Sequence, residues 1–442
     1  MTMASMRTAL LLTAMTSTSA IAQQRDVDRH LLQAARAEQP AVIASLEDMV
    51  RIESGSDDVE GVTKIAAYAS ERLRALGASV QRVPATNGQA PGLVQGTFRG
   101  SGKLRIVLQA HLDTVYRRGI LSTEPWRREG NKLFGPGIAD DKGGVAVILG
   151  SLKILKDVDW KNYKTLTVLL NPDEEIGSPG SGTIIARVGS ESDVVLSYEP
   201  SPAKAVAGHE GVLLSAAGTA RMTLVVNGRA AHAGAAQDEG RNALIELASE
   251  LVKTHDVART VPNTQLNWTE ANSGTARNQI PGRAQASADV RFNAPDATDK
   301  LLAAVEARVN EQRLGPDTQS EVSLEIMRPM FVAGEKGLAL AKMAQSIYAE
   351  LGQGDLQQET TREMPNENAT ARNLLLIPNT TGGTDAGFAG SSGKPAVLES
   401  MGLAGWGYHA KNEYVEVDSI VPRLYLTRRL LQQLGTTWPP KP

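Results

Sequence analysis

The chain has 442 residues, of which 41% are apolar and 21% charged, and its formal net charge is −3. This composition is ordinary for a chain that folds into two or three domains. The small net charge and the lack of a long basic block argue against nucleic acid or an acidic membrane as the main partner. Because the sequence contains no cysteine, disulfides, thiolate metal sites and cysteine nucleophiles are excluded.

The N-terminal segment has the features of a secretory signal. Arg7 supplies a positive charge, residues 9–14 are mostly apolar, and Ala20-Ile21-Ala22 fits the small-x-small cleavage pattern. The apolar run is too short to span a bilayer, and we expect no membrane span elsewhere. We therefore expect residues 1–22 to be removed and the mature protein to be exported. The alternative is an N-terminal extension that is not cleaved.

The first half of the chain alternates helical and strand patterns. Helical patterning covers residues 31–76, with interruptions predicted at Pro40 and around Gly55. Such alternation indicates the α/β class, with a mostly parallel sheet and helices on both faces. Further along, strands are predicted at 80–83, 93–98 and 104–108, and a helix at 141–155.

The pattern changes near Gly218. The succession β-α-β-β-α-β that follows is typical of a ferredoxin-like domain. We therefore expect residues 216–330 to be an inserted domain, with 23–215 and 331–442 forming one catalytic domain. The elements of the insert are predicted at 220–226 (strand), 241–253 (helix), 265–271 and 284–292 (strands), 299–312 (helix) and 320–327 (strand).

Five clusters of acidic and histidine residues fit the ligand set of a two-metal hydrolase. Three of them follow apolar segments that are predicted strands, at 106–108, 166–170 and 194–196, where open α/β sheets hold their ligands. Imidazole and carboxylate donors suit Zn²⁺, and Co²⁺ or Mn²⁺ can substitute. The clusters are His111 with Asp113, Asp140 with Asp141, Glu174 with Glu175, Glu199, and His409.

These motifs resemble the M20 family of metallopeptidases, and within it the glutamate carboxypeptidase branch. The matching stretches, in family order, are HLDTVYRRGIL, FGPGIADDKGGVAVIL, NPDEEIGSPGS, AAHAGAA, GGTDA and GYHAKNEYV. The resemblance implies a zinc-exopeptidase catalytic domain with a mostly parallel sheet, and an inserted ferredoxin-like lid that also forms a homodimer interface. Because the resembling proteins are bacterial, the periplasm is the expected location.

The resemblance assigns each ligand to one of two zinc ions. It implies that Asp140 bridges the ions, with His111 on one and His409 on the other. Glu175 and Glu199 then complete the two sides, one carboxylate for each ion. In the family the peptide that follows the bridging aspartate is cis, which turns that carboxylate toward both ions. A bridging carboxylate holds two ions about 3.5–4 Å apart.

Two further acids are expected to act beside the metals. Asp113 lies two residues from His111 on the same side of an extended chain, placed to accept the other N–H of the imidazole. The alternative is an acceptor in a turn. The resemblance implies that Glu174 is the general base, which takes a proton from the attacking water and donates it to the leaving amine. A solvated acidic turn is the alternative, and it fits Asp173 better.

The lid and the end of the chain supply candidate substrate residues. The resemblance implies that His232 in AAHAGAA stabilises the oxyanion in the other subunit's site, and that Asn278 is a second donor. Arg328 in MRPMF resembles the arginine that clamps the substrate's free carboxylate, which suits a two-point guanidinium contact. Arg291 is also a candidate, with surface pairing as the alternative. The backbone at Gly382 and Gly383 is expected to approach the substrate closely.

The sequence therefore predicts an exopeptidase with two zinc ions that releases a C-terminal amino acid, with glutamate expected, from folate-type, N-acyl or peptidyl substrates. One departure is that Lys204 does not align with the lysine that reads glutamate in this branch. An N-acyl amino acid amidohydrolase or dipeptidase is the close alternative. A non-catalytic metal- or peptide-binding protein is disfavoured by an intact Glu174. A nucleotide-binding enzyme is disfavoured because no P-loop or GxGxxG follows a strand.

Overall fold

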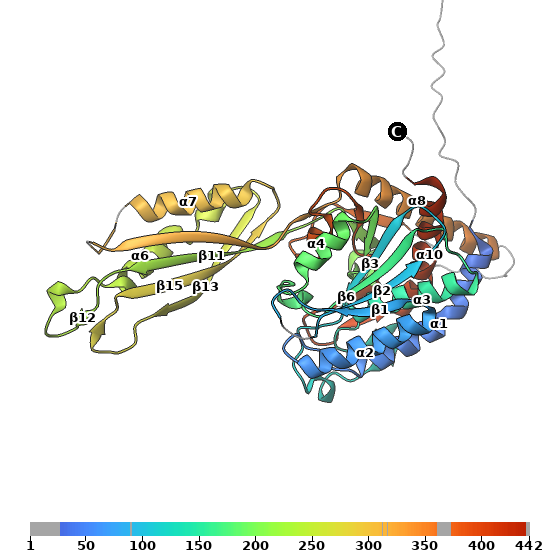
Figure 1. Ribbon diagram of the computed structural model, residues 1–442, viewed down its shortest axis with the longest axis horizontal. Coiled ribbons are helices and arrows are strands. Elements are labelled where there is room, and N and C mark those ends of the chain that lie inside the picture. Colours follow the sequence, from blue (N-terminus) through green and yellow to red (C-terminus); the bar gives the residue numbers. More distant parts are fainter. Residues whose placement is uncertain (1–26, 89–90, 312, 316, 360–372, 439–442) are drawn as a thin grey trace, which may run out of the picture.

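The computed structural model describes residues 27–88, 91–311, 313–315, 317–359 and 373–438. They form a larger part and a smaller part, which stands away from the larger one (Figure 1). The predicted signal, residues 1–22, lies outside the described residues. Within the described part of the chain, no helix combines the length and apolar character needed to cross a membrane.

The larger part is built on a six-stranded sheet in the order β1 (Ser79–Val83), β2 (Leu93–Arg99), β6 (Thr165–Asn171), β3 (Arg105–His111), β7 (Val194–Ser197) and β19 (Ala396–Leu398). The last four of these are parallel. β1 and β2 pair antiparallel and make one edge. Parallel strands covered on both faces need continuous apolar runs, and the TLTVLLN of β6 is buried at all but its first residue.

Helices cover both faces of this sheet (Figure 1). Neighbouring strand residues point to opposite faces, so Ile106 and Leu108 join the core beneath one set of helices while Val107 joins the other. The first set is α1 (Arg29–Val50), α2 (Val59–Leu76), α3 (Lys142–Asp157), α8 (Gly334–Glu359) and α10 (Ile420–Thr437). The second set is α4 (Gly182–Ser190) and α9 (Ala386–Gly390).

The predicted helix interruption at Pro40 is wrong, because α1 runs through it. Proline removes one helical hydrogen bond. Pro40 lies on the exposed face of α1, whereas Val42, Leu46 and Met49 on the other face are buried in the core. This packing holds the helix together despite the lost bond. The second predicted interruption, around Gly55, is correct and separates α1 from α2.

The smaller part contains β11 (Gly218–Asn227), α6 (Ala243–Thr254), β13 (Thr264–Ser273), β15 (Arg283–Phe292), α7 (Ala297–Glu311) and β16 (Gln319–Arg328). Its antiparallel sheet has the order β13-β15-β11-β16. Alternate residues of β15 are buried with residues of the two helices in a separate core. The order of elements matches the ferredoxin-like prediction, while the boundaries at residues 216 and 330 stay a prediction.

A second sheet of the larger part gathers segments that are far apart in sequence. Its order is β4 (Arg127–Glu129), β5 (Lys132–Phe134), β21 (Tyr414–Glu416), β20 (Ala404–Trp406) and β8 (Ser201–Pro202). Asp140 follows β5, Glu199 precedes β8, and His409 lies in the loop between β20 and β21. The sheet therefore brings ligands from three regions of the sequence to one place.

Candidate metal centre

The carboxyl ends of three adjacent parallel strands carry several of the predicted site residues. His111 is the last residue of β3, Glu174 and Glu175 form a 3-10 turn after β6, and Glu199 follows β7. In open α/β sheets this edge is where ligands bind. The tight turn after β6 lets both Glu174 and Glu175 line one cavity, although neighbouring residues of a strand would point apart.

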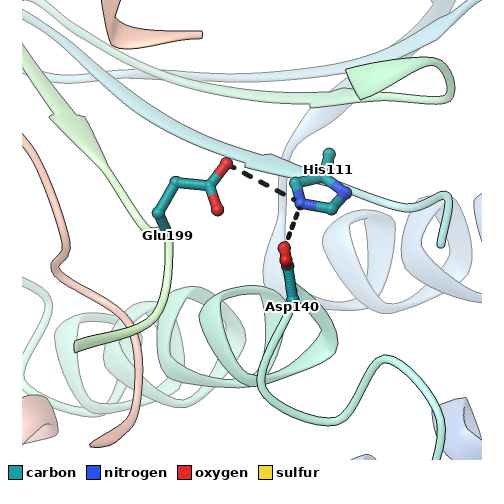
Figure 2. Close-up of side chains that lie close together, drawn as sticks. All are labelled: His111, Asp140 and Glu199. Carbon is teal, nitrogen blue, oxygen red and sulfur yellow. Dashed lines mark hydrogen bonds and ion pairs between the residues drawn. The ribbon is translucent and has the colours of Figure 1, made fainter. Parts of the chain in front are cut away.

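Five predicted ligands form two groups that share Asp140. In the first, His111 Nε2 lies 2.8 Å from Asp140 Oδ1 and 3.7 Å from Glu199 Oε1; Figure 2 shows these three side chains pointing toward one another. In the second, His409 Nε2 lies 3.2 Å from Asp140 Oδ2 and 3.0 Å from Glu175 Oε2. Each histidine therefore faces a different oxygen of the same carboxylate.

The charges of this cluster fit a pair of cations. Burial raises the pKa of Glu175 and of Glu199. Hydrogen bonds that the imidazole donates to Asp140 and Glu175 raise the pKa of His409 to about 10. Burial lowers the pKa of His111, but Glu199, Asp113 and Asp140 together raise it well above its usual range. Divalent cations would compete with protons at this cluster, because metal ligation needs neutral imidazole and ionised carboxylate.

Asp141 holds the turn that carries Asp140, the predicted bridging residue, through contacts with the backbone. The peptide between Asp140 and Asp141 is cis, as the resemblance implies. Asp141 Oδ1 accepts a hydrogen bond from the backbone N–H of Gly144 at 3.0 Å, which caps α3. Its other oxygen lies 3.4 Å from the backbone nitrogen of His111. The two adjacent acids therefore have different partners. Asp140 faces the two histidines, and Asp141 caps the N-terminus of α3.

Asp113 contacts both the ring of His111 and the backbone of the turn after β6. His111 Nδ1 lies 3.0 Å from the backbone oxygen of Asp113 and 3.4 Å from its Oδ1, so the shorter contact is with the main chain rather than the predicted carboxylate. The carboxylate instead accepts the backbone N–H groups of Glu174 at 3.0 Å and Glu175 at 3.1 Å, and the hydroxyl of Ser56 at 2.7 Å. It thereby ties the turn after β6 to the end of β3.

A cavity of about 800 Å³ is lined by four of the predicted metal ligands, Asp140, Glu175, Glu199 and His409. Glu174 in its wall is buried and paired with Arg328, whose Nη1 lies 2.7 Å from Glu174 Oε1. Arg328 also donates to the backbone oxygen of Glu174, and its Nε lies 3.8 Å from Asp385 Oδ1. Burial raises the pKa of Glu174 to about 8, and the positive charge of Arg328 opposes that rise. The predicted base and the predicted substrate clamp are therefore in direct contact.

The remaining predicted cavity residues are Arg291, Gly382 and Gly383, and all three line the cavity. Arg291 Nε lies 2.8 Å from Asp289 Oδ2 in a half-exposed pair. A Cβ at Gly383 would meet the guanidinium of Arg328 at 3.2 Å, whereas one at Gly382 would have only ordinary contacts. The close approach at Gly383 is therefore to Arg328.

His232 and Asn278 lie together but away from the metal ligands. β12 (Ala231–His232) pairs with β14 (Gln279–Ile280) at the far end of the smaller part (Figure 1). His232 Nδ1 accepts backbone N–H groups from Gly234 at 3.2 Å and Ala235 at 3.1 Å. The ring proton is thus placed on Nε2, which can donate outward. Neither His232 nor Asn278 lines the cavity of its own chain.

The structure adds three residues that sequence reasoning missed. Glu413 and Tyr116 contact each other behind the metal ligands, and Asp385 accepts hydrogen bonds from Asn171 and Ser178 beneath the cavity. Each belongs to a stretch already singled out, since Tyr116 is in HLDTVY, Asp385 in GGTDA and Glu413 in GYHAKNEY. The position of an acidic or phenolic residue within such a stretch could have marked each of the three as a candidate.

Two imidazole–carboxylate groups that share an aspartate, at the carboxyl edge of an α/β sheet, define a metal-dependent hydrolase. Residues 107–433 match the model of peptidase family M20/M25/M40. The sequence is 41% identical over 428 residues to Carboxypeptidase G2 of Pseudomonas sp. (strain RS-16), covering 97% of each chain. The chain therefore belongs to peptidase family M20/M25/M40, and it is an enzyme of the hydrolase class.

Solved structures share this fold. An M20 family metallo-carboxypeptidase from Sulfolobus solfataricus aligns with a TM-score of 0.65 at 17% identity, over 89% of this chain and 99% of that one. A dinuclear metal-binding peptidase of the M20 family from Bacillus subtilis aligns with a TM-score of 0.61 at 15% identity, over 91% and 99%. The expected fold, a catalytic domain with an inserted lid, is confirmed.

Proposed function

We propose that this protein is a metallocarboxypeptidase that hydrolyses an amide bond and releases a C-terminal glutamate from folate-type, N-acyl or peptidyl substrates. The observation that carries the proposal is the pair of groups sharing Asp140 beside the buried Glu174, in a cavity that also presents guanidinium groups. The 41% identity to Carboxypeptidase G2 over 97% of both chains supports the choice of glutamate.

Two Zn²⁺ ions per chain are the proposed cofactors, with Co²⁺ or Mn²⁺ able to substitute. His111 and Glu199 would hold one ion and His409 and Glu175 the other, with Asp140 between them. The donor set is imidazole and carboxylate throughout, which suits zinc. When bound, the ions polarise the substrate carbonyl and make water a stronger acid.

Glu174 carries the proton in the proposed reaction. Its carboxylate takes a proton from the attacking water and returns it to the leaving amine nitrogen, so that the C–N bond breaks with a neutral amine. Burial keeps the pKa of Glu174 close to the range in which a carboxylate can both accept and release a proton near neutral pH. Arg328 holds the side chain in one orientation through its contact at 2.7 Å.

The free carboxylate of the substrate is proposed to bind the guanidinium groups of the cavity. Arg328 and Arg291 both line it, and the side chain of Arg291 is 35% exposed while that of Arg328 is 8% exposed. A guanidinium pairs with a carboxylate at two points. The backbone at Gly382 and Gly383 forms the neighbouring wall.

A hydrolysis panel tests the proposal. Metal-loaded protein is mixed with p-aminobenzoyl-glutamate, the matching aspartate and alanine conjugates, N-acetyl amino acids and dipeptides, and release of the amine is followed. We expect the highest kcat/KM for the glutamate conjugate. A preference for N-acetyl amino acids would instead indicate the amidohydrolase alternative. No hydrolysis of any member by protein shown to hold metal would indicate the non-catalytic alternative.

One observation bears on how strictly the cavity selects glutamate. Lys204 Nζ lies 2.5 Å from Asp418 Oδ2, and Lys204 does not line the cavity. The lysine that the sequence offers near this segment therefore pairs with Asp418 outside the cavity, whose lining includes the apolar Leu213. An apolar contact at this position would accept side chains other than glutamate. The aspartate and alanine conjugates in the panel measure this tolerance.

A homodimer formed through the lid is proposed as the active form. Helix α6 exposes Leu244, Ile245 and Val252, and the i, i+7 spacing of Ile245 and Val252 places these two on one face of the helix. Strand β13 is an edge of the lid sheet. An apolar face and an unpaired edge are both covered when two copies meet about a two-fold axis. Sedimentation of the wild type against Ile245→Glu would show a dimer converted to a monomer.

The exported location is proposed from the N-terminal signal pattern. The segment with Arg7 and the small residues Ala20 and Ala22 motivates it, and the periplasm follows from the bacterial relatives. N-terminal sequencing of protein recovered from a periplasmic extract should begin near Gln23. Recovery of an intact Met1 in the cytosolic fraction would rule the proposal out.

A further inference from the structure

A buried carboxylate lies behind the metal ligands, in the loop that carries Asp140. Glu413 Oε1 lies 2.8 Å from the backbone nitrogen of Ala139 and 3.0 Å from that of Asp140. Glu413 Oε2 lies 2.8 Å from the backbone nitrogen of Gly137. The residue is 3% exposed. Three N–H groups of one turn therefore converge on a single side chain, and this turn ends at the bridging ligand.

Tyr116 joins the same carboxylate to the loop of His409. Its hydroxyl lies 2.8 Å from Glu413 Oε2 and 2.8 Å from the backbone oxygen of Ala410, the residue after His409. Tyr116 itself lies five residues after His111. Glu413 thus contacts the turn of Asp140. Tyr116, in the segment that follows His111, contacts both Glu413 and the loop of His409.

The loop of His409 needs such support because its backbone is irregular. His409 and Asn412 have φ values of 62°, in the left-handed region that non-glycine residues enter at a cost. The side chain of His409 is 53% exposed, so core packing does little to hold it. Glu413 lies between the end of this loop and the first residue of β21.

We propose that Glu413, supported by Tyr116, is a positioning residue that sets the separation of His409 and Asp140. By this route it controls the affinity of the metal site formed by Asp140, Glu175 and His409. The inference rests on the dinuclear centre of the proposed function. Both oxygens of Glu413 accept hydrogen bonds, so a glutamine would turn one acceptor into an N–H₂ group facing backbone N–H groups.

Glu413→Gln is the test variant, and Glu416→Gln is its matched control. Glu416 is also 3% exposed, and its oxygens accept the backbone N–H groups of Lys204 and Ala205 at 3.0 Å each, away from the metal ligands. Zinc affinity is measured by competition with a chromophoric chelator, and stoichiometry by elemental analysis after desalting. The visible absorption of the Co²⁺-loaded protein reports ligand geometry independently of activity.

We expect wild type and Glu416→Gln to hold two ions. Glu413→Gln should keep one ion tightly and bind the second about 10–100-fold more weakly, with a changed Co²⁺ spectrum. Turnover of this variant should recover at millimolar Zn²⁺, which a loss of folding would not allow. Tyr116→Phe should weaken the same site by a smaller factor, and it carries the test if Glu413→Gln does not fold.

Two ions held by Glu413→Gln, or by Tyr116→Phe in its place, with wild-type affinity and spectrum would overturn this inference while leaving the proposed function intact. A wild type that binds fewer than two ions would overturn both. Equal weakening in Glu416→Gln would also overturn it, because any buried carboxylate of this region would then have the same effect.

Discussion

The carboxylate of Glu174 lies 2.7 Å from the guanidinium of Arg328, and both residues line the cavity that the predicted metal ligands also line. Sequence reasoning predicted these two residues for different tasks, proton transfer and carboxylate binding. Their contact joins the two tasks, because the charge of Arg328 stabilises the ionised form of Glu174 that burial disfavours. Changes at either residue are therefore expected to affect the other.

Glu174→Gln should fold and hold metal but lose about 10²–10⁴-fold in kcat, as expected for the removal of a general base. Glutamine keeps the shape of the side chain and can accept a hydrogen bond from Arg328, but it cannot take a proton. The measurement is steady-state kcat with metal content determined on the same sample. Glu270→Gln, on the exposed lid wall of the same cavity, is the control and should keep near-normal turnover. Near-normal turnover in Glu174→Gln would show that another group is the base.

Arg328→Ala should move the acidic limb of the kcat/KM profile to higher pH. The base must be ionised to act, so activity falls as the pH drops through the pKa of Glu174. Burial raises that pKa and Arg328 lowers it, so removal of the guanidinium raises it further. Ionised Glu174, and hence activity, is then present only at higher pH than in the wild type.

Kinetics of the same Arg328 variant also test the carboxylate clamp. Loss of a two-point contact with the substrate should raise KM in addition to the pH shift. Arg221→Ala is the control, since Arg221 also lines the cavity but is not the guanidinium paired with Glu174, and its acidic limb should stay in place. An unmoved limb in Arg328→Ala would mean that the pair observed here has no influence on the base.

The sequence could indicate which side chains gather at the candidate metal centre, because the acidic and histidine residues stand in short local motifs. His111, Glu175 and Glu199 follow short apolar runs that favour buried strands, and the sheet brings the ends of these strands together. The strands and helices of the lid could also be predicted from the sequence, because strand alternation is strong in β15 and helical periodicity is strong in α6.

Other features depend on tertiary contacts that no local pattern encodes. The pairing of Arg328 with Glu174 links residues 154 positions apart. The sequence predicts that the carboxylate of Asp113 contacts the ring of His111, but this carboxylate lies nearer to the backbone N–H groups after β6. Pro40 was read as a helix break because its cost is local, whereas the buried face that outweighs it is not.

His409→Ala should lose mainly one metal ion, because His409 contacts only one of the two groups that share Asp140. Elemental analysis after zinc loading and desalting should fall from two ions per chain to about one. His209→Ala is the control, since that histidine is exposed and belongs to neither group. Two ions retained in His409→Ala would remove this histidine from the ligand set.

His232 is expected to act in the site of a partner subunit. It lies at the far end of the lid and does not line the cavity of its own chain (Figure 1). The N–H groups of Gly234 and Ala235 hold Nδ1 as an acceptor, so Nε2 is a fixed donor. A donor that meets the carbonyl oxygen strengthens as negative charge develops, so its loss should lower kcat more than it changes KM. The expected loss is about 10²–10³-fold in kcat for His232→Ala.

Subunit exchange distinguishes action across the interface from action within one chain. Inactive Glu174→Gln is mixed with inactive His232→Ala, and exchange is confirmed by mass spectrometry of differently tagged copies. If His232 serves the partner, each mixed dimer contains one site with both Glu174 and His232 intact, because the two substitutions fall together in the other site. At equal mixing half of the dimers are mixed, so one site in four should recover normal kcat. If His232 acts within its own chain, every site of the mixed dimer lacks one of the two residues, and confirmed exchange without recovered activity would exclude the arrangement proposed here.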